Sequence, residues 1–121
     1  MKLNPLTTKK LFGYSSWYNH YQDINEDKIR YDLSGCDKVF QAGDLFQIDD
    51  GWEPFVGDWL ETDSVKFPNG LRVLVDQIHA KGYKAGLWLA PFVAEKNSSL
   101  YHNHPDWFLH HHGKPWCLGA N

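Results

Sequence analysis

The chain has 121 residues, of which 42% are hydrophobic and 22% are charged, with a formal net charge of −3 at pH 7. This size and composition fit one globular domain and exclude disorder of the whole chain. The acidic balance argues against nucleic acid and anionic membrane surfaces as partners. No apolar run approaches the roughly 18–20 residues of a membrane span, and residues 1–10 lack a signal-peptide core, so we expect a cytoplasmic protein.

The first two predicted elements are a strand at residues 11–15 (LFGYS), with Trp17 just beyond its end, and a helix. Residues 23–25 offer N-cap side chains for this helix. Four side chains at spacings of four, three and four residues then form one helical stripe: Ile29, Leu33, Cys36 and Phe40. Gly43 is expected to end the helix in a left-handed conformation, and the Ser34 and Gly35 pair weakens its middle.

A second short buried strand is predicted at residues 45–48 (LFQI), and Asp49, Asp50 and Gly51 follow it directly. An ionised carboxylate offers two oxygens and about four lone-pair sites. The aspartate pair could therefore accept hydrogen bonds from neighbouring hydroxyl groups of a ligand. The alternative is that one aspartate caps a loop and the other is solvated. Residues 53–69 then form a loop whose length suggests a function.

A second helix and a third strand complete the regular pattern. One face of this helix is apolar, and Gly82 is expected to end it; the apolar residues are Leu71, Leu74, Val75 and Ile78. The third strand is predicted at residues 83–89 (YKAGLWL), with Trp88 near its exit. A short helix at residues 98–102 follows in the tail, where no fourth strand is evident.

The order β-α-β-α-β requires a parallel sheet with right-handed crossovers, which both a doubly wound sheet and a barrel satisfy. Residues that follow the three strands project from one rim, and a barrel gathers such residues around one pocket. No Gly-rich phosphate loop follows any of the three strands. We therefore predict an α/β fold, the parallel β-α-β-α-β portion of a (β/α)8 TIM barrel, with residues 1–10 as a lead-in and residues 11–121 as a partial barrel domain.

Six Trp residues are many for so short a chain, and such rings fill a core, cover an interface or offer flat faces for a ligand to stack on. Trp17 and Trp88 could stack on a sugar ring or simply cover the core. The histidines of the tail lack zinc-site spacing with a carboxylate or Cys partner, so we expect a solvated loop and no metal. Cys36 and Cys117 are expected to be unpaired thiols.

Several strings occur in family order and spacing between residues 11 and 107: GYSSWYNHY, FQIDDGW, GDWL, KFPNGL, IHAKGYKAGLWLAPF and LYHNHPDW. Together they closely resemble the bacterial α-galactosidases of glycoside hydrolase family 36. The related family 27 enzymes carry a Cys after the paired aspartates, where this chain has Gly51.

This resemblance implies a barrel enzyme that removes terminal α-linked galactose with retention of configuration and without a cofactor. Asp49 and Asp50 match the pair that hydrogen-bonds the galactose hydroxyls, and Trp17 and Trp88 match walls of the pocket. In the family the nucleophilic Asp follows strand four and the acid/base Asp follows strand six. Neither strand is found in this sequence, so the four matching residues are substrate-binding and no catalytic residue is assigned.

The alternative function is a non-catalytic, truncated half-barrel that self-associates and at most binds sugar. An α-N-acetylgalactosaminidase or a galactosyl-transferring relative also stays open. Because both outer strands would have unpaired edges, we expect a homo-oligomer or pairing with the missing remainder of the barrel. Six apolar residues are expected to lose the opposite wall of the barrel core, on whichever alternation holds: Phe12, Tyr14, Phe46, Ile48, Leu87 and Leu89.

Overall fold

The computed structural model describes residues 10–117, so residues 1–9 of the predicted lead-in lie outside the described residues. A parallel three-stranded sheet runs in chain order through β1 (Gly13–Ser15), β2 (Leu45–Ile48) and β3 (Lys84–Leu87). The predicted parallel order of neighbouring strands is confirmed. The bounds of β2 agree with the prediction, whereas β1 and β3 are shorter than predicted.

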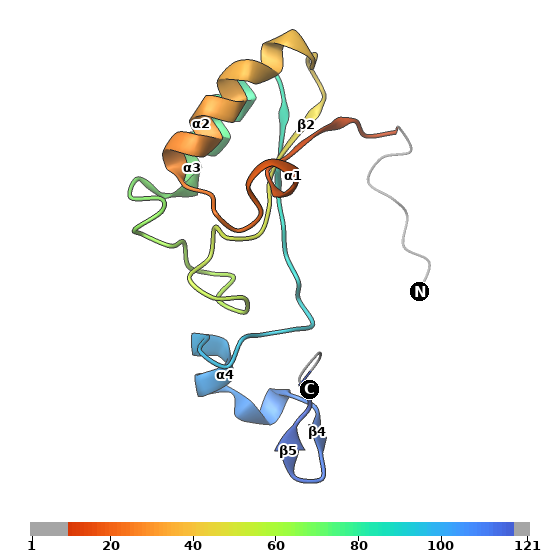
Figure 1. Ribbon diagram of the computed structural model, residues 1–121, viewed down its shortest axis with the longest axis vertical. Coiled ribbons are helices and arrows are strands. Elements are labelled where there is room, and N and C mark those ends of the chain that lie inside the picture. Colours follow the sequence, from red (N-terminus) through yellow and green to blue (C-terminus); the bar gives the residue numbers. More distant parts are fainter. Residues whose placement is uncertain (1–9, 118–121) are drawn as a thin grey trace.

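Two helices, α2 (Glu26–Gly35) and α3 (Gly70–Ala80), pack against each other on one side of the sheet (Figure 1). Asn25 begins α2 as its N-cap, because its side chain accepts a hydrogen bond from Lys28 N at 2.9 Å. The predicted apolar stripes form the core with β2. The residues of α2, α3 and β2 that are no more than 3% exposed are Ile29, Leu33, Leu74, Ile78, Phe46 and Ile48.

The predicted end of the first long helix at Gly43 is wrong, because α2 ends at Gly35 and a 3-10 turn, η1 (Cys36–Lys38), follows. The hydroxyl of Ser34 donates to Tyr31 O at 2.6 Å, and a Gly costs a helix about 1 kcal/mol relative to Ala. Gly43 does adopt a left-handed φ of 93°, but it serves the turn into β2, where its N–H donates to Gly82 O at 2.9 Å.

The two faces of the sheet differ in chemistry. Residues paired in register share a face, so Ser15, Gln47 and Gly86 lie opposite the helix-covered face. Phe46 and Ile48 are covered by the helices, so the expectation that they lack an opposite wall is wrong. Leu87 pairs with Ile48 and so lies on the same face as Ile48, although it is 44% exposed; Leu89, beyond β3, is 51% exposed. The face that the helices do not cover carries the small or polar residues Ser15, Gln47 and Gly86 near the strand ends.

A short helix that was not predicted, α1 (Trp17–His20), follows β1. It is tied to α2 through Asp32, whose carboxylate accepts a hydrogen bond from Tyr14 Oη and lies 2.6 Å from His20 Nε2. Burial, together with this carboxylate, raises the pKa of Tyr14. These contacts hold the segment that carries Trp17 against the rest of the sheet.

The tail after β3 contains α4 (Ser99–Asn103), the 3-10 turn η2 (Pro105–Trp107) and an antiparallel hairpin of β4 (His110–His111) and β5 (Lys114–Pro115). It extends away from the sheet (Figure 1). The predicted short helix is confirmed within one residue at each end, and the hairpin was not predicted. None of the helices between residues 10 and 117 has both the length and the apolar character to cross a bilayer.

Candidate functional site

A pocket of about 260 Å³ lies at the carboxyl ends of the three strands. Five residues line it: Trp17, Tyr18, Asp49, Asp50 and Trp88. The structure therefore brings together all four predicted site residues. Trp17 follows β1, Asp49 and Asp50 follow β2, and Trp88 follows β3. Tyr18, which is 89% exposed, was not predicted as a site residue, although it lies within the motif GYSSWYNHY. The volume is a little below the roughly 300–1,000 Å³ typical of ligand pockets.

Asp49 is fixed by hydrogen bonds on both of its carboxylate oxygens. Ser15 Oγ and Gln47 Nε2 donate to Oδ2 at 2.8 Å and 2.7 Å, and Asp50 N donates to Oδ1 at 3.0 Å. The backbone N–H of Asp49 donates to Ser16 Oγ at 2.9 Å. Ser15 and Gln47 belong to the polar face of the sheet. That face therefore positions the first aspartate of the pair.

Asp50 is held from the opposite side of the turn, where Gln22 Nε2 donates to its Oδ2 at 2.8 Å. Asp49 and Asp50 are each 7% exposed, so neither aspartate is solvated. Gly51 supplies the expected turn with a φ of 106°, and a Cβ at this position would lie 2.5 Å from Gln22 O. Lys66 Nζ donates to Gln22 O and Gly51 O, both at 3.1 Å, and so connects the turn at Gly51 to the segment that carries Gln22.

Glu53 is a buried acidic residue that sequence reasoning missed. It is 4% exposed, and burial beside the Asp50 carboxylate raises its pKa to about 7. Its Oε2 has no hydrogen-bond partner within the part of the chain that the structure describes. In the sequence it was one of several acidic residues of a long loop, and only its packing distinguishes it.

Aromatic residues support the wall that Trp88 forms. The indole N–H of Trp52 donates to Trp88 O at 3.0 Å, and Trp52 is 3% exposed. The ring of Trp59 lies edge-on to that of Trp88, with centroids 5.9 Å apart. On the other wall, Trp17 packs edge-on against Tyr21 at 5.3 Å. Both wall residues are only partly buried, so their rings keep surface available for a ligand.

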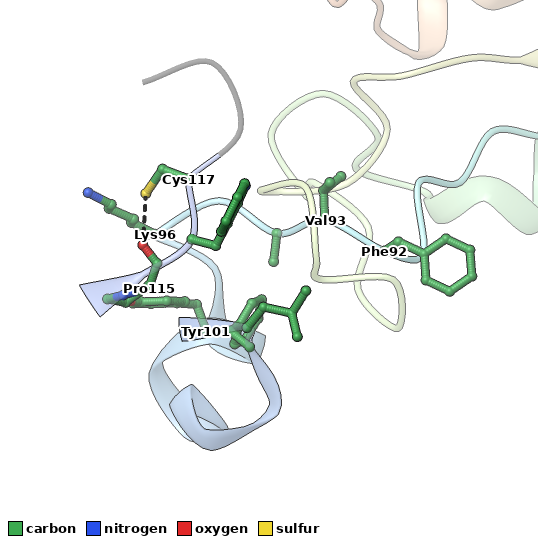
Figure 2. Close-up of a pocket in the computed structure, with 10 residues that line it drawn as sticks. Phe92, Val93, Lys96, Tyr101, Pro115 and Cys117 are labelled. Atoms are coloured by element: carbon green, nitrogen blue, oxygen red, sulfur yellow. Dashed lines mark hydrogen bonds between the residues drawn. The ribbon is translucent and has the colours of Figure 1, made fainter. Parts of the chain in front are cut away.

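A larger hollow of about 390 Å³ lies in the tail (Figure 2). Its lining is mostly apolar and includes Phe92, Tyr101 and Trp116, and Lys96 is the one charged residue among the described residues that line it. Figure 2 shows Lys96 and Cys117 at its edge, with Cys117 Sγ 3.7 Å from Pro115 O. Among the described residues no carboxylate lines this hollow, so it lacks the paired acceptors that the strand-end pocket offers and is not the candidate site.

Four of the tail histidines, at positions 102 and 110–112, are exposed, whereas His104 is half-buried; His110 and His111 form strand β4. Between residues 10 and 117 no group of three or more His, Cys, Asp or Glu side chains is arranged to hold a metal ion. Cys36 is a buried free thiol and Cys117 an exposed one.

The strand order and the carboxylates at the strand ends define the class of the protein. It is a parallel β/α protein with a pocket at the carboxyl ends of its strands, which is where such folds place their sites. A family model described as Melibiase matches residues 8–121, and the chain belongs to this family. The resemblance carried by the sequence motifs is confirmed.

Two curated relatives show how much of a longer protein the chain represents. It is 36% identical over 115 residues to alpha-galactosidase Mel36A of Lactobacillus acidophilus and, over the same length, to alpha-galactosidase AgaA of Geobacillus stearothermophilus. Each alignment covers 88% of this chain and 15% of the relative. The chain thus spans 15% of the length of these relatives.

Solved structures of α-galactosidases are also similar to this chain. TtGalA, an α-galactosidase from Thermus thermophilus in complex with p-nitrophenyl α-D-galactopyranoside, matches with a TM-score of 0.81 and 36% identity over 93% of this chain and 23% of that chain. The family 36 α-galactosidase AgaA from Geobacillus stearothermophilus matches with a TM-score of 0.80 and 33% identity over 93% of this chain and 16% of that chain.

Proposed function

We propose that this chain is part of an α-galactosidase, and that its strand-end pocket binds the galactose unit of α-galactosides. The observation that carries this proposal is the convergence of Asp49, Asp50, Trp17 and Trp88 on one pocket. Two carboxylates can accept hydrogen bonds from neighbouring hydroxyls, and a Trp face can cover the apolar side of a pyranose. Related structures hold p-nitrophenyl α-D-galactopyranoside and stachyose, which supports this ligand class.

In this proposal the two aspartates bind the sugar and do not cleave it. Retaining hydrolysis needs two carboxylates about 5–5.5 Å apart on either side of the glycosidic bond, one as nucleophile and one as acid. Asp49 and Asp50 are adjacent in the chain, and the backbone N–H of Asp50 donates a hydrogen bond to Asp49 Oδ1. Adjacent residues held in this way do not flank a bond from opposite sides. We therefore expect binding without turnover by these residues alone.

We also infer that the sheet is part of a (β/α)8 barrel and that residues 11–121 form one partial barrel domain after a lead-in at residues 1–10. The parallel order of the three strands and the polar residues gathered at one rim support this inference. In a barrel, β1 and β3 would each gain another strand as neighbour. Without it, their edges favour pairing with another copy of the chain or with further barrel strands.

Titration with methyl α-D-galactoside, followed by protein NMR, tests the proposal. We expect saturable binding, weaker binding of the glucose epimer, and at least a tenfold loss of affinity in Asp50→Asn, because a hydrogen bond to a charged group contributes about 1.5–3 kcal/mol. Asp106→Asn, at an exposed position of the tail, is the matched control and should bind as the unchanged chain does. Equal binding of both epimers, or no effect of Asp50→Asn, would contradict the proposal.

Hydrolysis of p-nitrophenyl α-D-galactopyranoside tests the enzymatic part separately. Binding without release of nitrophenol at high protein concentration is the expected result for the 121 residues, and it also fits the alternative of a non-catalytic half-barrel. If the chain hydrolysed this substrate and Asp49→Asn abolished the hydrolysis, the expectation that these residues bind the sugar without turnover would be wrong.

A further inference from the structure

A further hollow, of about 210 Å³, is lined by Asp50 but by neither Trp17 nor Trp88. Asp50 lines both this hollow and the candidate site. The other residues that line it include Gln22, Glu53, Lys66 and Glu95. Asp50 therefore lies between the pocket and a second hollow with polar lining, and groups in that hollow can control the orientation of the Asp50 side chain.

Neither Lys66 nor Glu95, the other charged residues that line this hollow, forms an ion pair or a hydrogen bond with Glu53 within the described residues. Lys66 Nζ is engaged by the backbone oxygens of Gln22 and Gly51, and Glu95 Oε2 accepts a hydrogen bond from Val56 N at 2.9 Å. No ion pair within residues 10–117 involves Glu53. A carboxylate buried beside another carboxylate without an ion-pair partner is unfavourable, and the pair is more stable when one of the two holds a proton.

A protonated Glu53 would also explain why its Oε2 has no hydrogen-bond partner among the described residues. As part of an ionised carboxylate, the buried Oε2 would be an acceptor without a donor. As part of a protonated carboxyl group, Glu53 has a donor to offer, and Asp50, which lines the same hollow, is the neighbouring carboxylate that can accept it. Gln22 Nε2 already donates to Asp50 Oδ2, so Glu53 would be the second donor behind the same carboxylate.

We propose that Glu53 is a positioning residue for Asp50, whose buried carboxyl group donates a hydrogen bond that fixes the Asp50 carboxylate toward the pocket. This inference rests on the proposed function, in which Asp50 accepts a hydrogen bond from the sugar. Gln22 and Glu53 together then set the rotamer of Asp50 before the ligand arrives, which lowers the ordering cost of binding.

The proposal has a consequence for pH. Burial and the Asp50 carboxylate raise the pKa of Glu53 to about 7, so the hydrogen bond is present below that pH. Above it Glu53 becomes a carboxylate and repels Asp50. The other charged groups facing this space are Lys66 and Glu95. Affinity for the sugar should therefore fall severalfold between pH 6 and pH 8.

Variants of the full chain separate positioning from general support of the fold. In Glu53→Gln the amide is a permanent neutral donor, so affinity for methyl α-D-galactoside at pH 6 should stay within about threefold of the unchanged chain and should no longer depend on pH from 6 to 8. Glu53→Leu removes the donor and should bind about tenfold more weakly at pH 6, a factor that corresponds to the roughly 1.4 kcal/mol of a net hydrogen bond. Glu95→Gln, which alters the other acid of the hollow, should keep the original pH profile.

A readout without sugar keeps this proposal distinct from the proposed function. The ¹³C shift of the Asp50 carboxyl, followed by NMR in the free chain, should show a step near pH 7 that disappears in Glu53→Gln. If this step is absent, or if Glu53→Gln keeps the original pH profile, the positioning role is overturned. If the step is present but no α-galactoside binds, the failure lies with the proposed function.

Discussion

The sheet and its helices, residues 13–88, and the tail, residues 89–117, are held in place by different kinds of interaction. The first region has a continuous apolar core between β2, α2 and α3. In the tail only Ser98 is buried among the described residues, whereas Phe92 is 97% and Leu109 is 80% exposed. One region is held by a core of its own, and the other depends on contacts with its neighbour.

The contacts that hold the tail are few and polar. Glu95 N donates to Val56 O at 2.7 Å, and Asp58 Oδ1 accepts a hydrogen bond from Leu100 N at 3.2 Å. Both partners lie in the loop between β2 and α3. Apolar periodicity accounts for the first region, whereas the place of the tail depends on a loop whose conformation no periodic pattern describes.

The largest effect should come from the core. Phe46→Ala removes a side chain that is 1% exposed and stacks on Tyr14 with ring centroids 4.5 Å apart. We expect a loss of about 3–5 kcal/mol in the free energy of unfolding, measured by urea denaturation and circular dichroism. Leu109→Ala in the tail should change it by less than about 0.5 kcal/mol. Similar losses in the two variants would break the contrast between the regions.

A pH effect of the next size should act where the two regions meet. Burial and Asp50 raise the pKa of Glu53 from 4.5 to about 7, so between these pH values the folded chain binds more protons than the unfolded chain. Stability should therefore fall as pH rises from about 4.5 to 7, by an amount on the order of 1–3 kcal/mol. Denaturation curves at several pH values test this. In Glu53→Gln this part of the dependence should vanish; if it persists, another group is responsible.

A steric change in the loop should release the tail while leaving the sheet intact. Gly57 has a φ of 120°, and a Cβ there would lie 2.9 Å from Ala94 Cβ and 3.0 Å from Ser98 Oγ. Gly57→Ala should cost about 1–3 kcal/mol through backbone strain and this clash. Amide hydrogen exchange should then become faster around residues 94–103 and change little in β2. The control is Gly113→Ala, where φ is 74° and the space is open, so residues 94–103 should keep their protection.

The smallest effect should concern a single helix end. Ser98 Oγ accepts a hydrogen bond from Tyr101 N at 3.1 Å and thereby begins α4. Ser98→Ala should destabilise this helix by about 1 kcal/mol, visible as a shift of the Cα resonances of residues 99–103 toward random-coil values. The exposed Ser34 is not a helix N-cap, so Ser34→Ala should leave these resonances unchanged. Unchanged resonances in Ser98→Ala would mean that loop contacts alone order α4.

Much of the sheet and of the pocket could be predicted from the sequence because each depends on a local rule. Apolar spacing predicted the buried positions Ile29 and Ile78, and β2 was predicted with its observed bounds. Two crossovers of one hand force parallel strands, so Asp50 and Trp88 had to meet at one rim. The grouping of the site residues follows from topology and needs no knowledge of packing.

Other features depend on packing, which sequence spacing does not show. The stripe from Ile29 to Phe40 continues past Gly35, although the helix ends there. The burial of Glu53 depends on Asp50 and on the fold of its loop, and its neighbours in the chain do not reveal it. The hairpin at residues 110–115 has no apolar alternation and depends on the turn at His112 and Gly113, which have φ values of 49° and 74°.

The three neighbouring indoles behind the pocket also give the molecule an optical property. The ring centroids of Trp52 and Trp59 lie 6.2 Å apart, and those of Trp59 and Trp88 lie 5.9 Å apart. At such separations the electronic transitions of the rings couple, so light absorbed by one ring is shared with the others. The ultraviolet circular dichroism should then carry a signal from the group as a whole. Because Trp88 belongs both to this group and to the pocket wall, the unlabelled chain reports on its own pocket by its spectrum.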